Sequence, residues 1–187
     1  MRHATDAVGT AILETRWGHI GVALSERGVL ALELPLLDRS LMARRLEAAW
    51  PAASPVDLAE LVELAEALAR YLDGEPVTFS EHLDLRAWTS FQRRVWDTTA
   101  AIPYGQTRTY GWVASQINLP RAYRAVGQAL GANPLPILIP SHRILARSGE
   151  LHGATGGLHY KRYLLALERG ERFLFPPAFL ISKADAS

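Results

Sequence analysis

The chain contains no cysteine, and this absence excludes two kinds of site. With no cysteine among its 187 residues, it can form neither a disulfide nor a metal site built on thiolates. Its six histidines are scattered, and no pair of them has helical ligand spacing beside a carboxylate. We therefore predict no bound metal and no cofactor.

Long apolar runs and an excess of one charge are also missing. No run approaches the roughly 20 residues that a membrane-spanning helix needs, and the N-terminus lacks the apolar core of a signal peptide. The formal net charge is +1, which argues against a partner bound by overall charge alone, although a local basic face is compatible with it. The sequence predicts a cytoplasmic monomer without a membrane partner.

The first part of the chain predicts strands followed by helices. Short β-rich runs separated by turn signals indicate an antiparallel meander over residues 9–34. Two helices are predicted after it, over residues 38–50 and 57–74, and the second is strongly amphipathic. A strand-like segment follows at 76–85. We therefore expect an α/β domain with a small antiparallel sheet over residues 1–86.

From residue 89 the pattern becomes mainly helical. Thr89 and Gln92 form a capping box, and Thr109 can cap a second helix. A third helix is predicted over residues 121–133, with Pro120 in its first turn. Two short helices with a tight connection are a helix-turn-helix candidate, and an ordinary helical hairpin is the alternative.

The remaining segments predict a strand, a turn that contains Ser141 and His142, a glycine-rich loop and a last helix. The strand-like run PILI occupies 136–139, the turn contains Ser141, and the helix is predicted over 158–170. A composition change near residue 86 suggests the domain boundary. The expected organisation is an N-terminal α/β domain, a mainly helical C-terminal domain and a surface tail, at residues 1–86, 87–174 and 175–187.

Ser141 and His142 stand next to each other, which raises the hypothesis of a serine hydrolase. Such enzymes need a base beside the serine in space and a carboxylate that orients the base. A histidine that directly follows the serine rarely turns back onto it, and no G-x-S-x-G elbow is present. A structural turn serine is the other interpretation.

Three segments carry a more specific pattern: IPYGQTRTYGWVA, RAYRAVGQALGANPLPILIPSHRI and GGLHYKRYLLALE. In order and spacing, over about residues 88–169, they resemble the DNA repair methyltransferases that remove alkyl groups from O6 of guanine. The family pattern at the active turn is Pro-Cys-His-Arg, whereas serine occupies the second position here. The resemblance implies a ribonuclease-H-like N-terminal domain and a winged-helix-like C-terminal domain, in which a helix-turn-helix accompanies the active-site turn.

The resemblance implies which residues contact DNA. The partner would be double-stranded DNA containing O6-alkylguanine, bound through the minor groove with the damaged base flipped into a pocket. Arg124 matches the arginine that fills the gap left by the base, and Tyr110 matches the tyrosine that helps to turn the nucleotide outward. A solvated arginine and a core tyrosine are the structural alternatives. Small residues would let the second helix approach the DNA backbone: Ala122, Ala125, Gly127 and Gly131.

The resemblance also implies a catalytic set and a base pocket. Ser141 occupies the acceptor position, and His142 and Glu168 match the residues that ionise the acceptor through a bound water. Asn133 would bridge the second helix and the active turn. The pocket would be lined by Pro140, Arg143, Ala154, Thr155 and Gly156. Ala154 stands where many members of the family carry a tyrosine, which implies a wider pocket or a weaker grip.

Serine at the acceptor position leaves two hypotheses about function. A hydroxyl is far less acidic than a thiol, so alkyl transfer is predicted to be absent. In the first hypothesis the native acceptor is a cysteine, and this chain carries a replacement that traps or silences it. In the second, serine is native and the protein is an alkyltransferase-like lesion binder that flags damage for excision-repair proteins. A serine hydrolase and a sequence-specific DNA-binding regulator are further alternatives.

Overall fold

The computed structural model describes residues 7–152 and 156–173. They form two compact units: Trp88–Glu171 is one, and the described residues before and after it form the other. The last predicted segment, the tail at 175–187, lies outside the described residues. None of the helices within the described ranges is long and apolar enough to cross a membrane.

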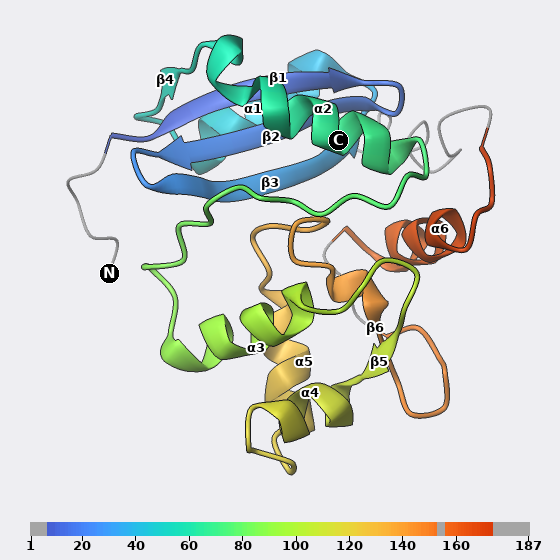
Figure 1. Cartoon of the computed structure of the whole chain (residues 1–187). Coiled ribbons are helices and arrows are strands. Elements are labelled where there is room, and N and C mark those ends of the chain that lie inside the picture. Colours follow the sequence, from blue (N-terminus) through green and yellow to red (C-terminus); the bar gives the residue numbers. More distant parts are fainter. Residues whose placement is uncertain (1–6, 153–155, 174–187) are drawn as a thin grey trace. The chain divides into compact units, whose positions relative to one another are not determined.

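The first unit is built on a four-stranded sheet in the order β3-β2-β1-β4 (Figure 1). The predicted meander is confirmed, because β1, β2 and β3 pair antiparallel in sequence order. The fourth strand pairs parallel with β1, so the sheet is mixed rather than antiparallel. The strands are β1 Gly9–Thr15, β2 Gly18–Ser25, β3 Gly28–Leu36 and β4 Ser54–Pro55.

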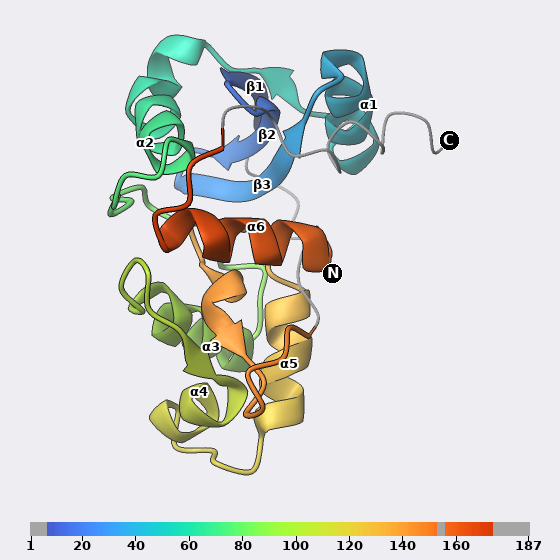
Figure 2. The ribbon, with the colours of Figure 1, turned by 90° about the vertical axis from the view of Figure 1, so that its right-hand side faces the viewer.

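Two helices pack beside the three long strands (Figure 2). Helix α1 covers Arg39–Ala49, and Asp38 caps it, because its carboxylate accepts from the backbone N–H groups of the first turn. The second predicted helix is divided into a 3-10 turn, η1 Leu58–Leu61, and α2 Val62–Leu72. A buried cluster joins α1 to the sheet: Leu36, Met42 and Leu46.

The prediction of a strand over residues 76–85 is wrong. The segment is irregular apart from one parallel bridge between Leu83 and Val29. Its backbone bonds to β3 only around Val29, where Val29 N donates to His82 O and Asp84 N donates to Val29 O. The buried Asp84 carboxylate accepts from Ser25 and from Arg86.

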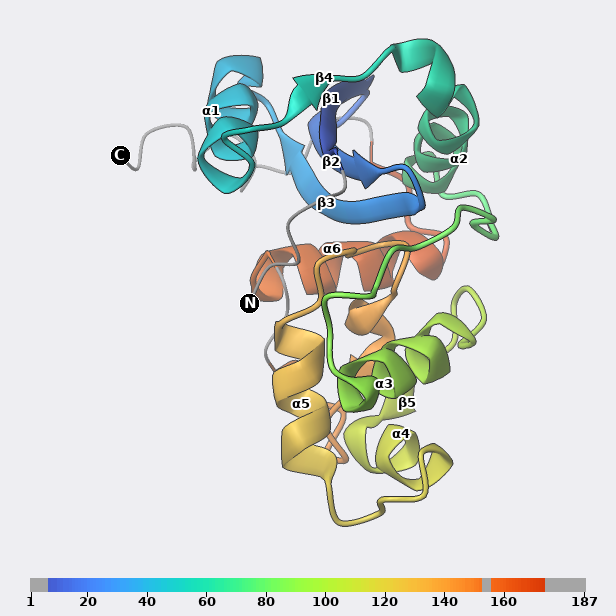
Figure 3. The same cartoon turned by 90° about the vertical axis from the view of Figure 1, so that its left-hand side faces the viewer.

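The second unit is mainly helical (Figure 3). Helix α3 begins at the capping box that the sequence predicts, with Thr89 Oγ1 accepting from Gln92 N and Gln92 Oε1 accepting from Thr89 N, each at 3.2 Å. Thr109 caps the next helix as predicted, since its hydroxyl accepts from Trp112 N. The helices are α3 Ser90–Ala100, α4 Tyr110–Gln116, α5 Tyr123–Gly131 and α6 Leu158–Glu168.

A short two-stranded sheet joins the start of α4 to the turn that contains Ser141. Strand β5, Arg108–Thr109, pairs parallel with β6, Ile144–Leu145. A 3-10 turn, η2 Ser141–Arg143, directly precedes β6. Because α4 follows β5 without a break, the pairing holds the first turn of α4 close to the residues after Ser141.

Two details of this unit differ from the prediction. The helix expected from residue 121 begins at Tyr123, because Ala122 N donates to Leu119 O and closes a turn in which Pro120 lies. Residues 136–139 form turns rather than a strand. Ile137 within them has a φ of 75°, in the left-handed region that a β-branched residue rarely adopts.

Candidate functional site

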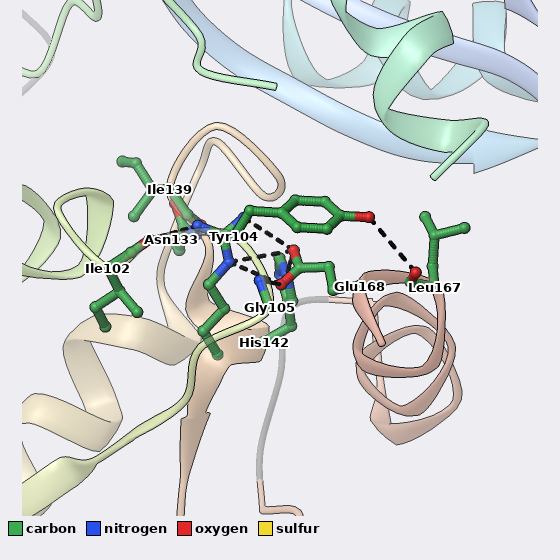
Figure 4. Close-up of polar contacts among 9 residues, drawn as sticks. Ile102, Tyr104, Gly105, Asn133, Ile139, His142, Leu167 and Glu168 are labelled. Atoms are coloured by element: carbon green, nitrogen blue, oxygen red, sulfur yellow. Dashed lines mark hydrogen bonds and ion pairs between the residues drawn. The ribbon is translucent and has the colours of Figure 1, made fainter. Parts of the chain in front are cut away.

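The segment from Asn133 to Arg143 is a buried turn that holds Ser141. The Asn133 amide donates to Ile139 O at 2.8 Å, and its oxygen accepts from Leu135 N at 2.9 Å. The same Nδ2 lies 3.4 Å from Ser141 Oγ. One side chain just after α5 therefore holds the backbone of the turn at Ile139 (Figure 4) and also contacts the Ser141 hydroxyl.

His142 and Arg143 both bind Glu168, which comes from the end of α6. The His142 Nε2–Glu168 Oε1 distance is 2.7 Å. Arg143 binds the same carboxylate through Nε, at 3.1 and 3.0 Å, and through Nη2, at 2.9 Å. The side chains of all three are almost fully buried. Such a fork is the strongest arrangement of a guanidinium and a carboxylate.

The protonation states of this group follow from burial and from Arg143. Burial lowers the pKa of His142 below its usual value, and this outweighs the opposite effect of Glu168. Burial alone would raise the pKa of Glu168, but the hydrogen bonds and charges of His142 and Arg143 lower it to about 2. At neutral pH the imidazole is therefore neutral and the carboxylate is ionised. The imidazole then carries its proton on Nε2, toward Glu168, and Nδ1 is its acceptor atom.

The PYG segment before β5 completes the support of Glu168. Gly105 N donates to Glu168 Oε2 at 3.0 Å, and Arg143 Nη1 donates to Ile102 O at 2.6 Å. The Tyr104 ring lies under the Arg143 guanidinium, 5.8 Å from centroid to Cζ. Figure 4 shows Tyr104 and Gly105 beside Glu168, with the Tyr104 hydroxyl directed at Leu167. The carboxylate oxygens are thus held by a histidine, an arginine and a backbone amide.

A buried lysine forms a second polar group, between α6 and α4. Lys161 is 1% exposed, and its Nζ donates to Ile144 O and to His152 O. The hydroxyl of Tyr110 donates to the same His152 carbonyl at 3.0 Å, and the amine lies 5.8 Å from the Tyr110 ring centroid. Burial lowers the pKa of Lys161 to about 8 and raises the pKa of Tyr110. The contacts join β6, the start of the glycine-rich loop and α4.

Helix α5 presents small residues and two exposed large ones. Its middle lies against α4, because a Cβ on Gly127 would be 3.7 Å from the Tyr110 ring, whereas a Cβ on Gly131 would meet nothing within 4 Å. Ala122 and Ala125 are partly exposed. Tyr123 and Arg124 are exposed at the first turn.

Charge is divided unevenly between the two units. Residues 88–171 contain ten Lys and Arg but four Asp and Glu, a formal charge of +6. The rest of the chain has ten basic and fifteen acidic residues, a formal charge of −5. The net charge of +1 therefore conceals a basic unit, which is the one that contains the helix pair and the Ser141 turn. A basic unit of this kind favours a polyanionic partner.

The structure brings four of the predicted site residues together around the turn: Asn133, Ser141, His142 and Glu168. Tyr110 and Arg124 lie on the two helices of the pair. Pro140 is buried and Gly156 is exposed, while Ala154 and Thr155 lie outside the described residues. The guanidinium of Arg143 is engaged with Glu168 and Ile102, and a role for it in a base pocket stays a prediction.

Lys161 and Tyr104 were missed by reasoning from the sequence. A signal for Lys161 existed, because it lies seven residues before Glu168 in an apolar helix, and residues two turns apart share a face. A lysine and a glutamate on the buried face of one helix need polar partners. Nothing in the sequence marked Tyr104 as a neighbour of Arg143.

The turn places a neutral imidazole, paired with an ionised carboxylate, directly after Ser141. A neutral imidazole that donates its Nε2–H to an ionised carboxylate can accept a proton on Nδ1, which is the arrangement of a general base. The guanidinium of Arg143, in the same turn, is engaged by Glu168 and by Ile102 O. A histidine base ionises a thiol far more readily than a serine hydroxyl.

Comparisons with known proteins converge on one family. A family model described as "6-O-methylguanine DNA methyltransferase, DNA binding domain" matches residues 90–170. The chain is 53% identical over 104 residues to a methylated-DNA–protein-cysteine methyltransferase of Mycolicibacterium paratuberculosis, covering 56% of this chain and 62% of that protein. It is 43% identical over 110 residues to an inducible protein of the same name from Bacillus subtilis, covering 59% and 61%. The chain thus matches less than two thirds of the length of these relatives.

Solved structures match over nearly the whole chain. The structure of Mycobacterium tuberculosis O6-methylguanine methyltransferase superposes with a TM-score of 0.74 at 35% identity, covering 93% of this chain and 99% of that one. A structure of the Mycobacterium tuberculosis protein in complex with DNA gives a TM-score of 0.70 at 34% identity, covering 94% and 99%. The shared fold is an α/β chain with a small mixed sheet and six helices.

Proposed function

The chain belongs to the 6-O-methylguanine DNA methyltransferase family, and we propose that it binds O6-alkylguanine in double-stranded DNA without transferring the alkyl group. One observation carries this proposal: the buried turn keeps the His142–Glu168 pair and the contact of Asn133 with position 141, yet the side chain at that position carries a hydroxyl. The chain has the surroundings of an acceptor but not the acceptor atom.

DNA binding is proposed for the basic second unit. Helix α5 would enter the minor groove, where its small residues allow a close approach, and the damaged base would leave the stack for a pocket beside Ser141. Arg124 would fill the gap, because it is exposed at the first turn of α5. Tyr110 would contact the phosphate of the flipped nucleotide. A relative whose structure was solved in complex with DNA supports DNA as the partner.

Transfer is proposed to fail because of the chemistry of oxygen. A free thiol has a pKa of about 8.5, and a neighbouring base makes the thiolate accessible near neutral pH. A serine hydroxyl lies well above that value. Serine enzymes overcome this at carbonyl carbons, where an oxyanion hole stabilises the developing charge. Displacement at a saturated alkyl carbon creates no such oxyanion, so the His142–Glu168 pair cannot compensate.

The first experiment restores the thiol. Ser141→Cys should accept one alkyl group from a duplex containing O6-methylguanine and then stop, which mass spectrometry detects as one methyl on the peptide with residue 141. Ser148→Cys is the matched control, because Ser148 is exposed and the chain has no other cysteine. The unmodified chain should gain no mass. Methylation of Ser141 itself would refute the chemical argument.

The second experiment tests recognition. The unmodified chain should bind a duplex with one O6-methylguanine more tightly than the same duplex with guanine, and binding should weaken as salt rises. Equal affinity for both duplexes would refute lesion recognition. Dependence on the surrounding sequence instead of the lesion would favour a DNA-binding regulator, and turnover of activated esters would favour a serine hydrolase.

The same variant separates the two hypotheses about serine. A Ser141→Cys chain that transfers the methyl group supports a native cysteine acceptor, since the remaining site would be intact. A variant that binds the lesion but stays unmodified supports a native lesion binder that signals to excision-repair proteins. We also propose that the first unit is ribonuclease-H-like, that the second is winged-helix-like, and that the protein is a cytoplasmic monomer.

A further inference from the structure

Two exposed apolar side chains lie at the start of α5. Tyr123 is 50% exposed and Leu119 is 42% exposed, and Leu119 lies in the turn that leads into the helix. Figure 3 shows the α4–α5 connection at the end of α5 that is remote from the 141–143 turn. Single exposed apolar residues need no explanation, but Tyr123 stands directly beside Arg124.

Tyr123 also contacts Arg124 directly. The two residues are adjacent in the helix, so their side chains would ordinarily point about 100° apart. Nevertheless the Arg124 guanidinium lies 5.9 Å from the centre of the Tyr123 ring. Both side chains are exposed, and Arg121, three residues before Arg124, is exposed as well. An exposed aromatic ring and an exposed arginine thus lie in contact at the start of α5 on the basic unit.

From this geometry we propose that Tyr123 is a DNA-contacting residue, which stacks on the base pair next to the nucleotide that Arg124 replaces. The inference rests on the proposed function, because it uses the same helix and groove. An exposed ring has a face that every base can stack on, and aromatic or apolar side chains wedge open base steps in the minor groove. The charge of the unit supplies the attraction, and the ring supplies a contact that does not depend on charge.

The proposal differs from a role in which Tyr123 only holds Arg124 in place. In that case removal of the ring would matter only while Arg124 is present. If Tyr123 contacts DNA itself, removal of the ring weakens binding in both backgrounds. A double-mutant cycle distinguishes the two roles.

The experiment measures binding to a duplex with one O6-methylguanine, for the unmodified chain, Tyr123→Ala, Tyr123→Phe and Leu158→Ala. The last is the control for loss of an exposed apolar side chain, because Leu158 is 44% exposed and belongs to α6 rather than to the helix pair. Tyr123→Ala should weaken binding roughly tenfold, the loss of one base–aromatic stack of about 1.4 kcal/mol. Tyr123→Phe and Leu158→Ala should stay within about twofold, since stacking needs the ring and not the hydroxyl.

Two further readouts decide the outcome. Tyr123→Ala should leave the salt dependence of binding unchanged, whereas Arg124→Ala should reduce its slope by roughly one ion. The tenfold loss should persist when Tyr123→Ala is made in the Arg124→Ala chain. Unchanged affinity of Tyr123→Ala, or a loss that disappears without Arg124, would overturn the inference. A chain that does not prefer the lesion in its unmodified form refutes the proposed function instead, so the two failures are distinct.

Discussion

Replacing Glu168 by glutamine tests how much of the second unit depends on one carboxylate. Glu168 accepts hydrogen bonds from His142, from Arg143 and from Gly105 N, and its side chain is 1% exposed. Glutamine has nearly the same shape but no charge. Its amide N–H would also face a donor in either orientation, because both carboxylate oxygens accept from N–H groups.

The cost can be worked out in two ways. Removing one partner of a buried ion pair leaves the other charge uncompensated and costs about 3–5 kcal/mol. Independently, the pKa of Glu168 falls from 4.5 to about 2, and a shift of this size corresponds to about 3 kcal/mol of stability. The two values agree, so we expect Glu168→Gln to lower the free energy of unfolding at pH 7 by roughly 3–5 kcal/mol.

The pH dependence provides a second check. Because the folded pKa of Glu168 is lowered, its contribution is present above about pH 4.5 and is lost as the pH falls toward 2. The unmodified chain should therefore lose more stability than Glu168→Gln when denaturant unfolding is repeated at decreasing pH. Glu150→Gln is the control, because the Glu150 side chain is 71% exposed and its pair with His152 should contribute little. A Glu168→Gln chain within about 1 kcal/mol of the parent at pH 7 would refute the reasoning.

Three further outcomes are expected. Lys161→Met should remove a pH dependence of the free energy of unfolding. The folded pKa of Lys161, about 8, lies below the unfolded value of 10.5, so the unmodified chain should gain about 3 kcal/mol of stability relative to the variant from pH 8 to 10.5. A constant difference in stability between the two chains over this range would contradict the prediction. Asn133→Ala should lower the free energy of unfolding by about 3 kcal/mol, because buried Ile139 O and Leu135 N lose this partner; unchanged denaturation would contradict it. Arg124→Ala should unfold like the parent within about 0.5 kcal/mol but bind the lesion duplex several kcal/mol more weakly, and a parallel loss of stability would show that Arg124 is structural.

The elements with a local signature could be predicted from the sequence. The meander of β1 to β3 follows from β-rich runs between turns, and the start of α3 follows from the Thr89–Gln92 capping box. The predicted strand at 136–139 failed because an apolar run reads the same in a strand and in a buried turn. The parallel pairing of β4 with β1 joins segments that are distant in the chain, so no local sequence pattern predicts it.

The candidate site likewise contains residues that could be predicted from the sequence and contacts that could not. His142, Glu168 and Asn133 were placed by resemblance, and the contacts of His142 with Glu168 and of Asn133 with Ser141 are visible only in the structure. The engagement of Arg143 with Glu168 and Ile102 needed the fold, because these partners come from three segments of the chain. Lys161 was missed since a lysine on an amphipathic helix is usually solvated.

The conformation of Ile137 restricts which residues can replace it in the turn. Its left-handed backbone costs on the order of 1–3 kcal/mol, while its buried side chain, 2% exposed, contributes about 1.5–3 kcal/mol. Glycine would relieve the backbone but leave a void, and asparagine would tolerate the conformation but bury an amide. Neither replacement improves both quantities. Either change at position 137 is therefore expected to be tolerated only together with changes in the residues that surround it.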